Sequence, residues 1–347
     1  MDMRDIAKLA GVSSATVSRV INQSATVRPD TATRVQRVID QLKFYPNSSA
    51  TTLKHGKSST YGLIIPDITN PFFPELIRSF EKILVDNNRE MLMATTDFHA
   101  SRIQQSIRRM LVRRVDGVAL IASEIETEPI EALIHNRVPL VTMDRLITGP
   151  GLSDVKIDNR SGMDQAIKFL KEFGHTEIGF IGGMIGPTIS DHRSRAFIKT
   201  MTKQGLQVNP EFVRAGNYRI PGGEAAMTEM LLLPSWPTAI LTANDLTAIG
   251  ALRAIHRHNL TVPGDISVIG FDDIELSDIL HPPLTTLRLS RHELAEQLFG
   301  ALEAMREEPN VSGRQYSIKT SLVIRESVGP VRKTIGRNNK GIRHPKR

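Results

Sequence analysis

Cysteine is absent from the 347 residues of this chain, which excludes disulfide bonds, thiolate nucleophiles and cysteine-ligated metal sites. Long apolar runs are also missing, since no stretch approaches the roughly 20 apolar residues that a membrane-spanning helix needs. The first residues lack the apolar core of a signal peptide. We therefore expect a soluble cytoplasmic protein that makes no contact with a membrane.

Charge is unevenly distributed along the chain, whose formal net charge is +7. Residues 1–60 contain nine Lys or Arg against four Asp or Glu, and residues 331–347 contain seven Lys or Arg and no acid. The remainder is mildly acidic. Basic ends on an acidic body favour a polyanionic partner, although the same charges could merely keep the protein in solution. The length indicates two or three domains.

Residues 3–22 predict two short helices joined by a tight turn. Apolar side chains recur at helical spacing in each helix, which lets one face be buried. Gly11 can end the first helix, and Ser13 can cap the second by accepting a backbone N–H. The apolar positions are Ile6, Leu9 and Ala10, then Val17, Val20 and Ile21. The pair forms a helix-turn-helix, whose second helix can enter a major groove of DNA; a helical hairpin without that role is the alternative.

The outward face of the second helix carries small side chains and one arginine. Small residues let the helix approach base edges, and Arg19 has the paired donors that suit O6 and N7 of guanine. The candidate DNA contacts on this segment are Ser14, Ala15, Thr16, Ser18, Arg19 and Asn22.

A third helix is expected from Pro29, a residue that suits the first helical position. Its apolar positions are Val35, Val38, Ile39 and Leu42. Residues 47–55 predict a further short helix with almost no apolar face, so alone in water it should be marginal. Leu53 is either an ordinary exposed residue of that helix or a wedge that enters between base steps in a minor groove.

From Tyr61 the pattern changes to apolar strands that alternate with amphipathic helices, which predicts parallel sheets covered on both faces. Residues 61–330 are too many for one common sheet, so we expect two α/β lobes. The strands are expected at 61–65, 90–95, 117–121, 139–143, 177–182, 238–243 and 266–271, with helices that include apolar stripes over 73–84 and 163–170.

Polar side chains follow several of these strands. Because ligands of open α/β sheets bind beyond the carboxyl ends of the strands, we expect a cleft between the lobes that takes a hydroxylated small molecule, with Phe72 able to cover a sugar ring. Asp and Asn after strands are also ordinary turn and cap residues, but four equivalent strand ends favour the cleft. The residues concerned are Asp67, Asn70, Asp144, Arg145, Asn244, Asp245, Asp272 and Asp273.

Catalysis, a cofactor and a metal site are not expected. The glycine-rich segment 179–186 fits neither the dinucleotide fingerprint nor the P-loop, and no G-x-S-x-G motif exists. His256 and His258 are two apart on a predicted helix and face different ways. A sugar-acting enzyme and a sugar-uptake binding protein remain as alternatives, against which the DNA-binding segment and the missing signal peptide argue.

From Met3 to Pro330 the chain resembles bacterial transcription regulators of the lactose-repressor/galactose-repressor (LacI/GalR) family. The most specific motif is D-I-A-K-L-A-G-V-S-S-A-T-V-S-R-V-I-N at residues 5–22. Further motifs are Y-P-N at 45–47, N-P-F-F at 70–73, T-A-N-D at 242–245, V-P-G-D-I-S-V-I-G-F-D-D at 262–273, P-P-L-T-T at 282–286 and L-V-I-R-E-S at 322–327.

The resemblance implies a sequence-specific transcriptional regulator, of the repressor kind, with an all-α helix-turn-helix head and a periplasmic-binding-protein-like body. It implies a homodimer on a near-palindromic double-stranded operator and a sugar-like effector bound between the lobes. The implied parts are a head at 1–46, a hinge helix and linker at 47–60, a body at 61–330 and a basic disordered tail at 331–347. Lobe 1 would comprise 61–160 and 291–320, and lobe 2 would comprise 161–290 and 321–330. Ala50 and Leu53 would contact DNA from the hinge helix.

Seven residues match the family's effector site. Arg193 matches an arginine that grips a ligand hydroxyl or carboxylate, and Tyr218 lies where a stacking aromatic is common. The full set is Asn70, Phe72, Asp144, Arg193, Tyr218, Asn244 and Asp272.

Two departures from the family pattern have consequences. Arg28 stands where a serine or threonine usually caps the third helix, so we expect a cap weaker by roughly 1 kcal/mol. Residues 331–347 have no apolar period in place of the leucine-heptad tail of tetrameric members, so we expect a dimer. We further expect a two-state switch in which lobe closure around the effector changes operator affinity. The identity of the effector, the direction of its effect and the operator sequence stay open.

Overall fold

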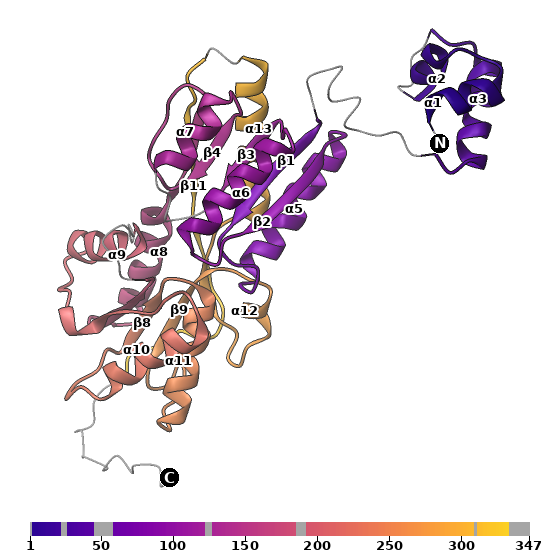
Figure 1. Cartoon of the computed structure of the whole chain (residues 1–347). Helices are drawn as coiled ribbons and strands as arrows, with labels where there is room; N and C mark the ends of the chain where they lie inside the picture. Colours follow the sequence, from indigo (N-terminus) through magenta and orange to yellow (C-terminus); the bar gives the residue numbers. More distant parts are fainter. Residues whose placement is uncertain are drawn as a thin grey trace. The chain divides into compact units, whose positions relative to one another are not determined.

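The computed structural model describes residues 2–21, 26–44, 58–121, 127–184, 192–308 and 311–332. The chain separates into two compact units, Met1–Ser58 and Ser59–Arg347, which are considered separately below (Figure 1). The described residues contain no helix long and apolar enough to cross a membrane.

The first unit is entirely helical among its described residues. Its helices are α1 (Met3–Ala10), α2 (Ser14–Ile21) and α3 (Pro29–Gln41). Gly11 ends α1 with φ +62°, a left-handed conformation that glycine adopts without strain. Ser13 Oγ accepts from the backbone N–H of Thr16 at 3.2 Å. The two helices, the glycine turn and the Ser13 cap are thus confirmed, and Arg28 makes no side-chain cap on α3, as expected.

One apolar assignment in this unit was wrong. Leu9 was expected on the buried face of α1, but it is 64% exposed, and Ala7 is buried in its place. Helices α2 and α3 cover the side of α1 that carries Ile6, Ala7 and Ala10. Spacing alone could not distinguish the two sides, because Ala7 and Leu9 lie at similar angles on either side of the Ile6–Ala10 line. The side chains that complete this small core are Val17, Val35, Val38 and Ile39.

The second unit contains two six-stranded sheets, which define its lobes. In lobe 1 the strand order is β11-β5-β4-β3-β1-β2, and all neighbours are parallel. Its strands are β1 (Thr60–Ile65), β2 (Glu90–Thr95), β3 (Gly117–Leu120), β4 (Leu140–Met143), β5 (Leu152–Asp158) and β11 (Gln315–Lys319). Helices α5 (Phe72–Asp86) and α13 (Arg291–Glu307) pack on one face, and α6 (Ala100–Val112) and α7 (Thr127–His135) on the other.

Lobe 2 has the strand order β12-β10-β9-β8-β6-β7, with β12 antiparallel at the edge and the other neighbours parallel. Its strands are β6 (Ile178–Gly182), β7 (Val213–Ala215), β8 (Ala239–Thr242), β9 (Ser267–Asp272), β10 (Thr285–Arg288) and β12 (Ser321–Val323). Helices α8 (Asn159–Glu172) and α9 (His192–Lys203) pack on one face, and α10 (Ile220–Leu231) and α11 (Asp245–Arg257) on the other. The short α12 (Leu276–Ile279) and a 3₁₀ turn (Pro210–Phe212) complete the lobe.

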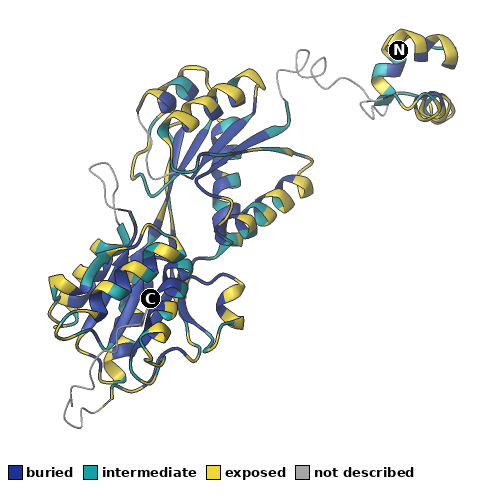
Figure 2. Ribbon diagram, turned by 60° about the horizontal axis from the view of Figure 1, so that its bottom comes forward, coloured by how far each residue is buried: buried dark blue, intermediate teal, exposed yellow. Residues whose placement is uncertain are grey.

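Burial follows this layering, since the strands of both sheets are largely buried while the outer faces of the helices are exposed (Figure 2). All seven predicted strands are present, and the two lobes confirm the predicted fold class. Five strands were not predicted: β5, β7, β10, β11 and β12. Three of them are edge strands, and β5 alternates apolar residues with Asp154, Lys156 and Asp158, so none shows a continuous apolar run.

Three chain segments join the lobes within the described residues: β5 to α8, β10 to α13, and β11 to β12. Two of these segments are bonded to each other. Oγ1 of Thr320, between β11 and β12, donates to the carbonyl oxygen of Asp158 at 2.9 Å and accepts from the backbone N–H of Gly162 at 3.0 Å. Thr320 is buried, so these bonds are shielded from water.

The helices α10 and α11 approach each other closely because glycines face the contact. A Cβ atom at Gly250 would lie 2.1 Å from the carbonyl oxygen of Ile220, and one at Gly223 would lie 2.2 Å from that of Thr247. By contrast, a Cβ atom at Gly300 on α13 would meet no heavy atom of the described chain within 4 Å.

Gly250→Ala should therefore destabilise the second unit by about 3 kcal/mol, because a methyl group would press on backbone that cannot move aside. Gly300→Ala, the matched control, should instead stabilise it by roughly 0.5–1 kcal/mol through better helix propensity. Denaturant unfolding followed by circular dichroism measures both. Equal stability of the two variants would contradict the close packing of α10 on α11.

Candidate functional site

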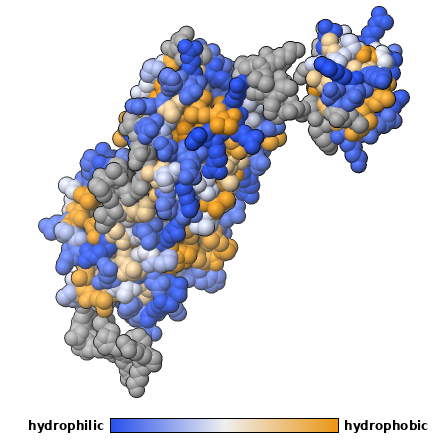
Figure 3. All heavy atoms as spheres, viewed as in Figure 1, coloured by the Kyte–Doolittle hydropathy of each residue, from blue (hydrophilic) through white to orange (hydrophobic). Residues whose placement is uncertain are grey.

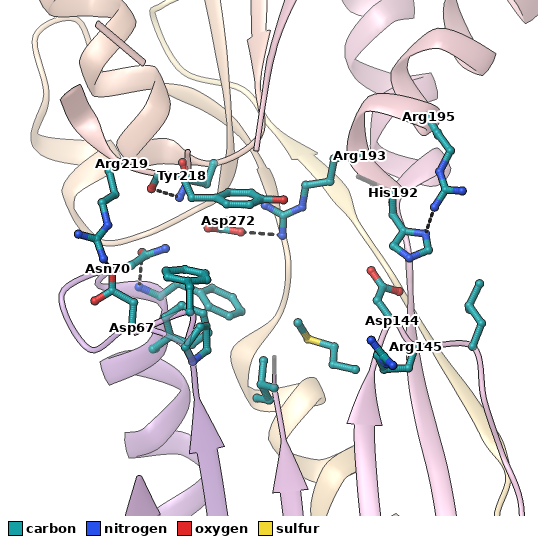
Figure 4. A pocket seen from close by; sticks show the side chains of 18 residues that line it. Asp67, Asn70, Asp144, Arg145, His192, Arg193, Arg195, Tyr218, Arg219 and Asp272 are labelled. Atoms are coloured by element: carbon teal, nitrogen blue, oxygen red, sulfur yellow. Dashed lines mark hydrogen bonds and ion pairs between the residues drawn. The ribbon is translucent and has the colours of Figure 1, made fainter. Parts of the chain in front are cut away.

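A pocket of about 350 Å³ lies between the two lobes, at the carboxyl ends of their strands (Figure 4). This volume is at the lower end of the range of about 300–1,000 Å³ that is common for small-molecule sites. Both lobes contribute to the lining, which mixes aromatic, cationic and acidic side chains. It comprises Pro66, Asp67, Asn70, Phe72, Phe73, Phe98, Ile121, Met143, Asp144, Arg145, Leu146, His192, Arg193, Arg195, Tyr218, Arg219, Asn244 and Asp272.

The structure brings all seven predicted effector-site residues into this lining: Asn70, Phe72, Asp144, Arg193, Tyr218, Asn244 and Asp272. They come from separate elements of the two lobes, because parallel strands place their carboxyl ends at one edge of a sheet. Of the other polar residues predicted after strands, Asp67 and Arg145 also line the pocket.

Asp245 and Asp273 were expected in the cleft, and both expectations were wrong. Asp245 points into lobe 2 and accepts from Ser277 Oγ at 2.9 Å and from Thr286 Oγ1 at 2.6 Å. Asp273 instead forms ion pairs with Arg288 and Arg325. Neighbours in sequence point to different sides after a strand, so one residue of each pair faces inward.

Asp272 is held in a strained backbone conformation, with φ +114°, and its side chain is only 4% exposed. Nη2 of Arg193 lies 3.2 Å from its Oδ1 and forms an ion pair with it. Burial raises the pKa of Asp272 to about 6, and Arg193 partly offsets that effect. A buried carboxylate in a strained backbone conformation is typical of a functional site.

Arg193 is fixed by three contacts. Besides the ion pair, it donates to the carbonyl oxygen of Ala243, and its guanidinium carbon lies 3.7 Å from the ring centroid of Phe271. A cation held over an aromatic ring and a carbonyl is already ordered before a ligand arrives. Arg193 can therefore bind a ligand oxygen at a small entropic cost.

The two asparagines of the predicted set also have structural tasks. Asn244 caps α11, since its Oδ1 accepts from the backbone N–H of Thr247 at 2.9 Å, and its Nδ2 donates to the carbonyl oxygen of Tyr218 at 3.0 Å. Asn70 accepts from the backbone N–H of Phe72 at 3.1 Å. Both the cap and the cleft interpretations of these residues are thus compatible with their positions.

Tyr218 extends over the pocket from a left-handed backbone position, with φ +61°. Its ring lies where a side chain at Gly183 would be, because a Cβ atom there would come within 2.2 Å of the ring. Gly183, directly after β6, therefore leaves room for this aromatic ring.

Asp144 also adopts a left-handed conformation, with φ +55°, and accepts from the backbone N–H of Ile157 at 2.7 Å. Burial raises the pKa of its carboxyl group, although the backbone hydrogen bond and the charges of His192 and Arg193 act in the opposite direction. Asp144 is thus held rigidly at the wall of the pocket, facing the start of α9 (Figure 4).

Sequence reasoning missed three cationic or titratable residues of the lining: His192, Arg195 and Arg219. Arg219 joins the lobes, since its Nη2 lies 3.3 Å from Asp67 Oδ2 and 3.0 Å from Asp97 Oδ1. His192 and Arg195 lie one turn apart with Arg193 between them, and this cluster of basic residues was the signal that could have identified them.

The predicted DNA contacts on α2 lie on its accessible side. Ser14, Ala15 and Arg19 are exposed, and Thr16 and Ser18 are half-buried. Asn22, Ala50, Leu53 and the tail from residue 333 lie outside the described residues. Across the described ranges, no three His, Asp or Glu side chains gather in a way that could bind a metal ion.

Comparison with known proteins gives two family matches. Residues 2–47 match the model for bacterial regulatory proteins of the lacI family, and residues 167–328 match the periplasmic binding protein-like domain. The ribose operon repressor of Haemophilus influenzae is 32% identical over 327 residues, which cover 94% of this chain and 98% of that protein. The HTH-type transcriptional repressor PurR of Actinobacillus pleuropneumoniae is 34% identical over 332 residues, with coverage of 94% and 98%.

Solved structures are also similar to this chain. The lac repressor dimer bound to operator and the anti-inducer ONPF has a TM-score of 0.84 and 25% identity, covering 95% of this chain and 99% of that one. A LacI family transcriptional regulator from Enterococcus faecium with bound ribose has a TM-score of 0.69 and 25% identity, covering 79% of this chain and 100% of that one.

The buried carboxyl groups near the pocket predict a pH-dependent stability. Burial, and then the charge of Asp272, raise the pKa of Asp245 from 3.8 to about 7. The folded state therefore holds a proton that the unfolded state releases near pH 4. The contribution of Asp245 to the free energy of unfolding is complete below about pH 4 and is lost as the pH rises through 7. Asp245→Asn cannot ionise, and the Thr286 hydroxyl can turn to accept from the new amide.

We expect the melting temperature of Asp245→Asn, relative to that of the unchanged protein, to increase as the pH is raised from 5 to 8. The control Asp86→Asn removes an exposed carboxylate, and its difference from the unchanged protein should stay nearly constant. Scanning calorimetry at several pH values measures both differences. A flat difference for Asp245→Asn would show that Asp245 does not titrate in this range.

Proposed function

This chain belongs to the lacI family of bacterial regulatory proteins, and on that premise we propose that it represses transcription from an operator under the control of a small hydroxylated ligand. The observation that carries the proposal is the presence, in one chain, of a helix-turn-helix and a pocket lined by two α/β lobes. Relatives that span nearly the whole chain are transcriptional repressors. We assign no catalytic role and propose that the protein acts in the cytoplasm, where bacterial DNA lies.

Operator recognition is assigned to α2. Its accessible side is formed of small residues and Arg19, which suits close approach to base edges in a major groove. Ser14, Ala15, Thr16, Ser18 and Asn22 complete the proposed contact set. Residues 47–60 are proposed as a hinge segment, in which Ala50 and Leu53 contact the minor groove.

Effector binding is assigned to the pocket between the lobes. Carboxylates, amides and Arg193 provide the donors and acceptors that hydroxyl groups need, while Phe72 and Tyr218 can cover a sugar ring. The ligand of one structural relative is ribose, which is of this class. Because the ligand would contact both lobes, it can favour the closed arrangement through its difference in affinity for the two states.

We propose that the protein acts as a homodimer on a near-palindromic operator. Apolar residues interrupt the hydrophilic surface of the second unit (Figure 3). Large apolar side chains there are strongly exposed, among them Val85 at 63%, Val112 at 75% and Ile279 at 69%. These three side chains lie on separate helices, α5, α6 and α12, so the proposal of a homodimer is supported by the dimeric relative and not by one apolar patch. The solved lac repressor structure is a dimer on its operator.

The operator-binding role predicts a change in base preference. Arg19→Ala should relax the preference at one position in each half-site, at a cost of about 1–3 kcal/mol. The control is Arg34→Ala, which removes an exposed arginine on α3. Any loss of affinity in this variant should be equal for all sequences. The base preference is measured by letting the full chain select binding sites from a DNA library at a fixed salt concentration. If Arg19→Ala kept the selected sequence unchanged, its assignment would be wrong; if the unchanged protein selected no sequence at all, the proposed function would fail.

The effector role predicts that space at Gly183 is needed for ligand binding. Gly183→Ala would displace the Tyr218 ring. For a sugar that stabilises the unchanged protein, the affinity of this variant should be lower by about tenfold or more. Gly149→Ala adds the same methyl group in open space and is the control. A thermal-shift screen of monosaccharides, ribose included, gives the affinities. Operator binding without ligand should be the same for all three proteins. Unaltered ligand affinity in Gly183→Ala would remove Tyr218 from the site.

A further inference from the structure

Helix α13 contacts the turn that carries Asp272 at its first residue, Arg291, and the start of β1 near its last turn, at Glu303. We propose that Arg291 and Glu303 are positioning residues that couple the effector pocket to the segment leading to the DNA-binding unit. Twelve residues separate them, so at a rise of about 1.5 Å per residue they lie roughly 18 Å apart along the helix axis. The inference rests on the proposed function, because it names residues that connect the two sites of the regulator.

The first end of α13 binds the backbone of residues 272–275, which we call the pocket turn. Nη1 of Arg291 donates to the carbonyl oxygen of Asp272 at 2.6 Å, and Nη2 donates to that of Asp273 at 2.7 Å. These bonds join the lobes, since α13 packs in lobe 1 and the pocket turn follows β9 of lobe 2. The Arg291 side chain is only 17% exposed, so water competes weakly for its donors.

Glu75 on α5 adds a second contact between lobe 1 and the pocket turn. Its Oε2 lies 2.5 Å from Nη2 of Arg291, and its Oε1 accepts from the backbone N–H of Glu275 at 3.1 Å. Hydrogen bonds to charged groups are stronger than those between neutral groups. A shift of the pocket turn on ligand binding therefore acts on both α5 and α13.

The other end of α13 contacts the start of β1. Glu303 accepts from the hydroxyl group of Tyr61, and its two oxygens accept from Arg306 at 2.9 and 2.6 Å. The ring of Tyr61 also packs edge-on against Phe299, with the ring centroids 5.7 Å apart. Polar and aromatic contacts thus fix the start of β1 to α13.

Arg89 connects Glu303 to Ser59, the first residue of the second unit. Its Nη2 lies 3.6 Å from Glu303 Oε2, and its Nη1 donates to Ser59 Oγ at 3.4 Å. The backbone of Ser59 is left-handed, with φ +56°, while its N–H donates to Asp116 at 3.0 Å and its carbonyl oxygen accepts from Glu90 at 2.8 Å. A serine keeps this conformation only where its neighbours hold it, so these contacts fix the direction of the chain at Ser59.

Between its ends α13 is packed along its length. Leu294, Leu298 and Leu302 are buried, and the helix lies against α5 and the strands β3, β4 and β5. Close-packed interiors have low compressibility and transmit strain. Displacement of one end of α13 should therefore be felt at the other.

Hydrogen–deuterium exchange of the full chain, resolved to single amides, tests this coupling without a ligand. Arg291→Gln loosens the pocket end of α13, and Glu303→Gln loosens the β1 end. Exchange in the central strands β3 and β8 reports unfolding of each lobe, and all increases are counted relative to it. The reporter amides are those of Ile274 and Glu275 at the pocket end and of Ser59 and Glu90 at the β1 end.

We expect each variant to increase exchange about tenfold or more at both ends, including the end that it does not touch. The control Glu296→Gln removes an exposed carboxylate of the same helix that pairs with His292, and it should leave both ends unchanged. Increases confined to the altered end in both variants overturn the inference, as does an increase at both ends in the control. If one variant does not fold, the other decides, because coupling between two sites is reciprocal.

Binding of the DNA sequence that the unchanged protein selects is measured with the same preparations. Affinity should fall about tenfold in Arg291→Gln and Glu303→Gln, because a loosened Ser59 must be ordered on binding, and should be unchanged in Glu296→Gln. Unaltered affinity in both variants overturns the inference. If the unchanged protein selects no sequence, the proposed function fails, while the exchange measurements still decide this inference by themselves.

Discussion

The ion pair between Arg193 and Asp272 connects the pocket to the rest of the second unit. Arg193 lies against the ring of Phe271, which belongs to the core of lobe 2. The carbonyl oxygen of Asp272 accepts from Arg291, and Arg291 also forms an ion pair of 2.5 Å with Glu75 on α5 of lobe 1. A ligand that alters the Arg193–Asp272 pair therefore acts on a continuous series of contacts from the pocket to both lobes. Such contiguity is a physical route for coupling, and double-mutant cycles along it would measure how much free energy it carries.

The central strands and the helix-turn-helix could be predicted from the sequence because each is encoded locally. Apolar runs such as 61–65 and 266–271 are buried on both faces in a parallel sheet, and Gly11 with Ser13 specifies a turn and a cap. The edge strands could not be predicted in this way. β7 and β12 have three residues each, and the buried Asp154 in β5 makes sense only once its three donors are known. Leu9 was misassigned because the side of α1 that is covered depends on where α2 and α3 pack.

The pocket shows the same division between local and tertiary information. Residues after strands were predictable as a group, since the topology of a parallel sheet gathers them at one edge. The sequence could not predict which member of the pairs Asn244–Asp245 and Asp272–Asp273 faces the pocket. Asp245 and Asp273 are turned away by donors from distant segments. Asn244 shows that the two interpretations of a polar residue need not exclude each other. It caps α11 and orients the segment that carries Tyr218, so a structural role places the neighbouring ring at the site.

Two of the chain segments that join the lobes are bonded to each other through Thr320. The Thr320 hydroxyl joins the segment between β11 and β12 to the end of β5 and the start of α8, so two of the three connections between the lobes are held together. Separating these two connections would break two buried hydrogen bonds, which costs free energy. We therefore expect that any rearrangement of the lobes keeps these two connections side by side, and that the third connection, from β10 to α13, can shift more independently.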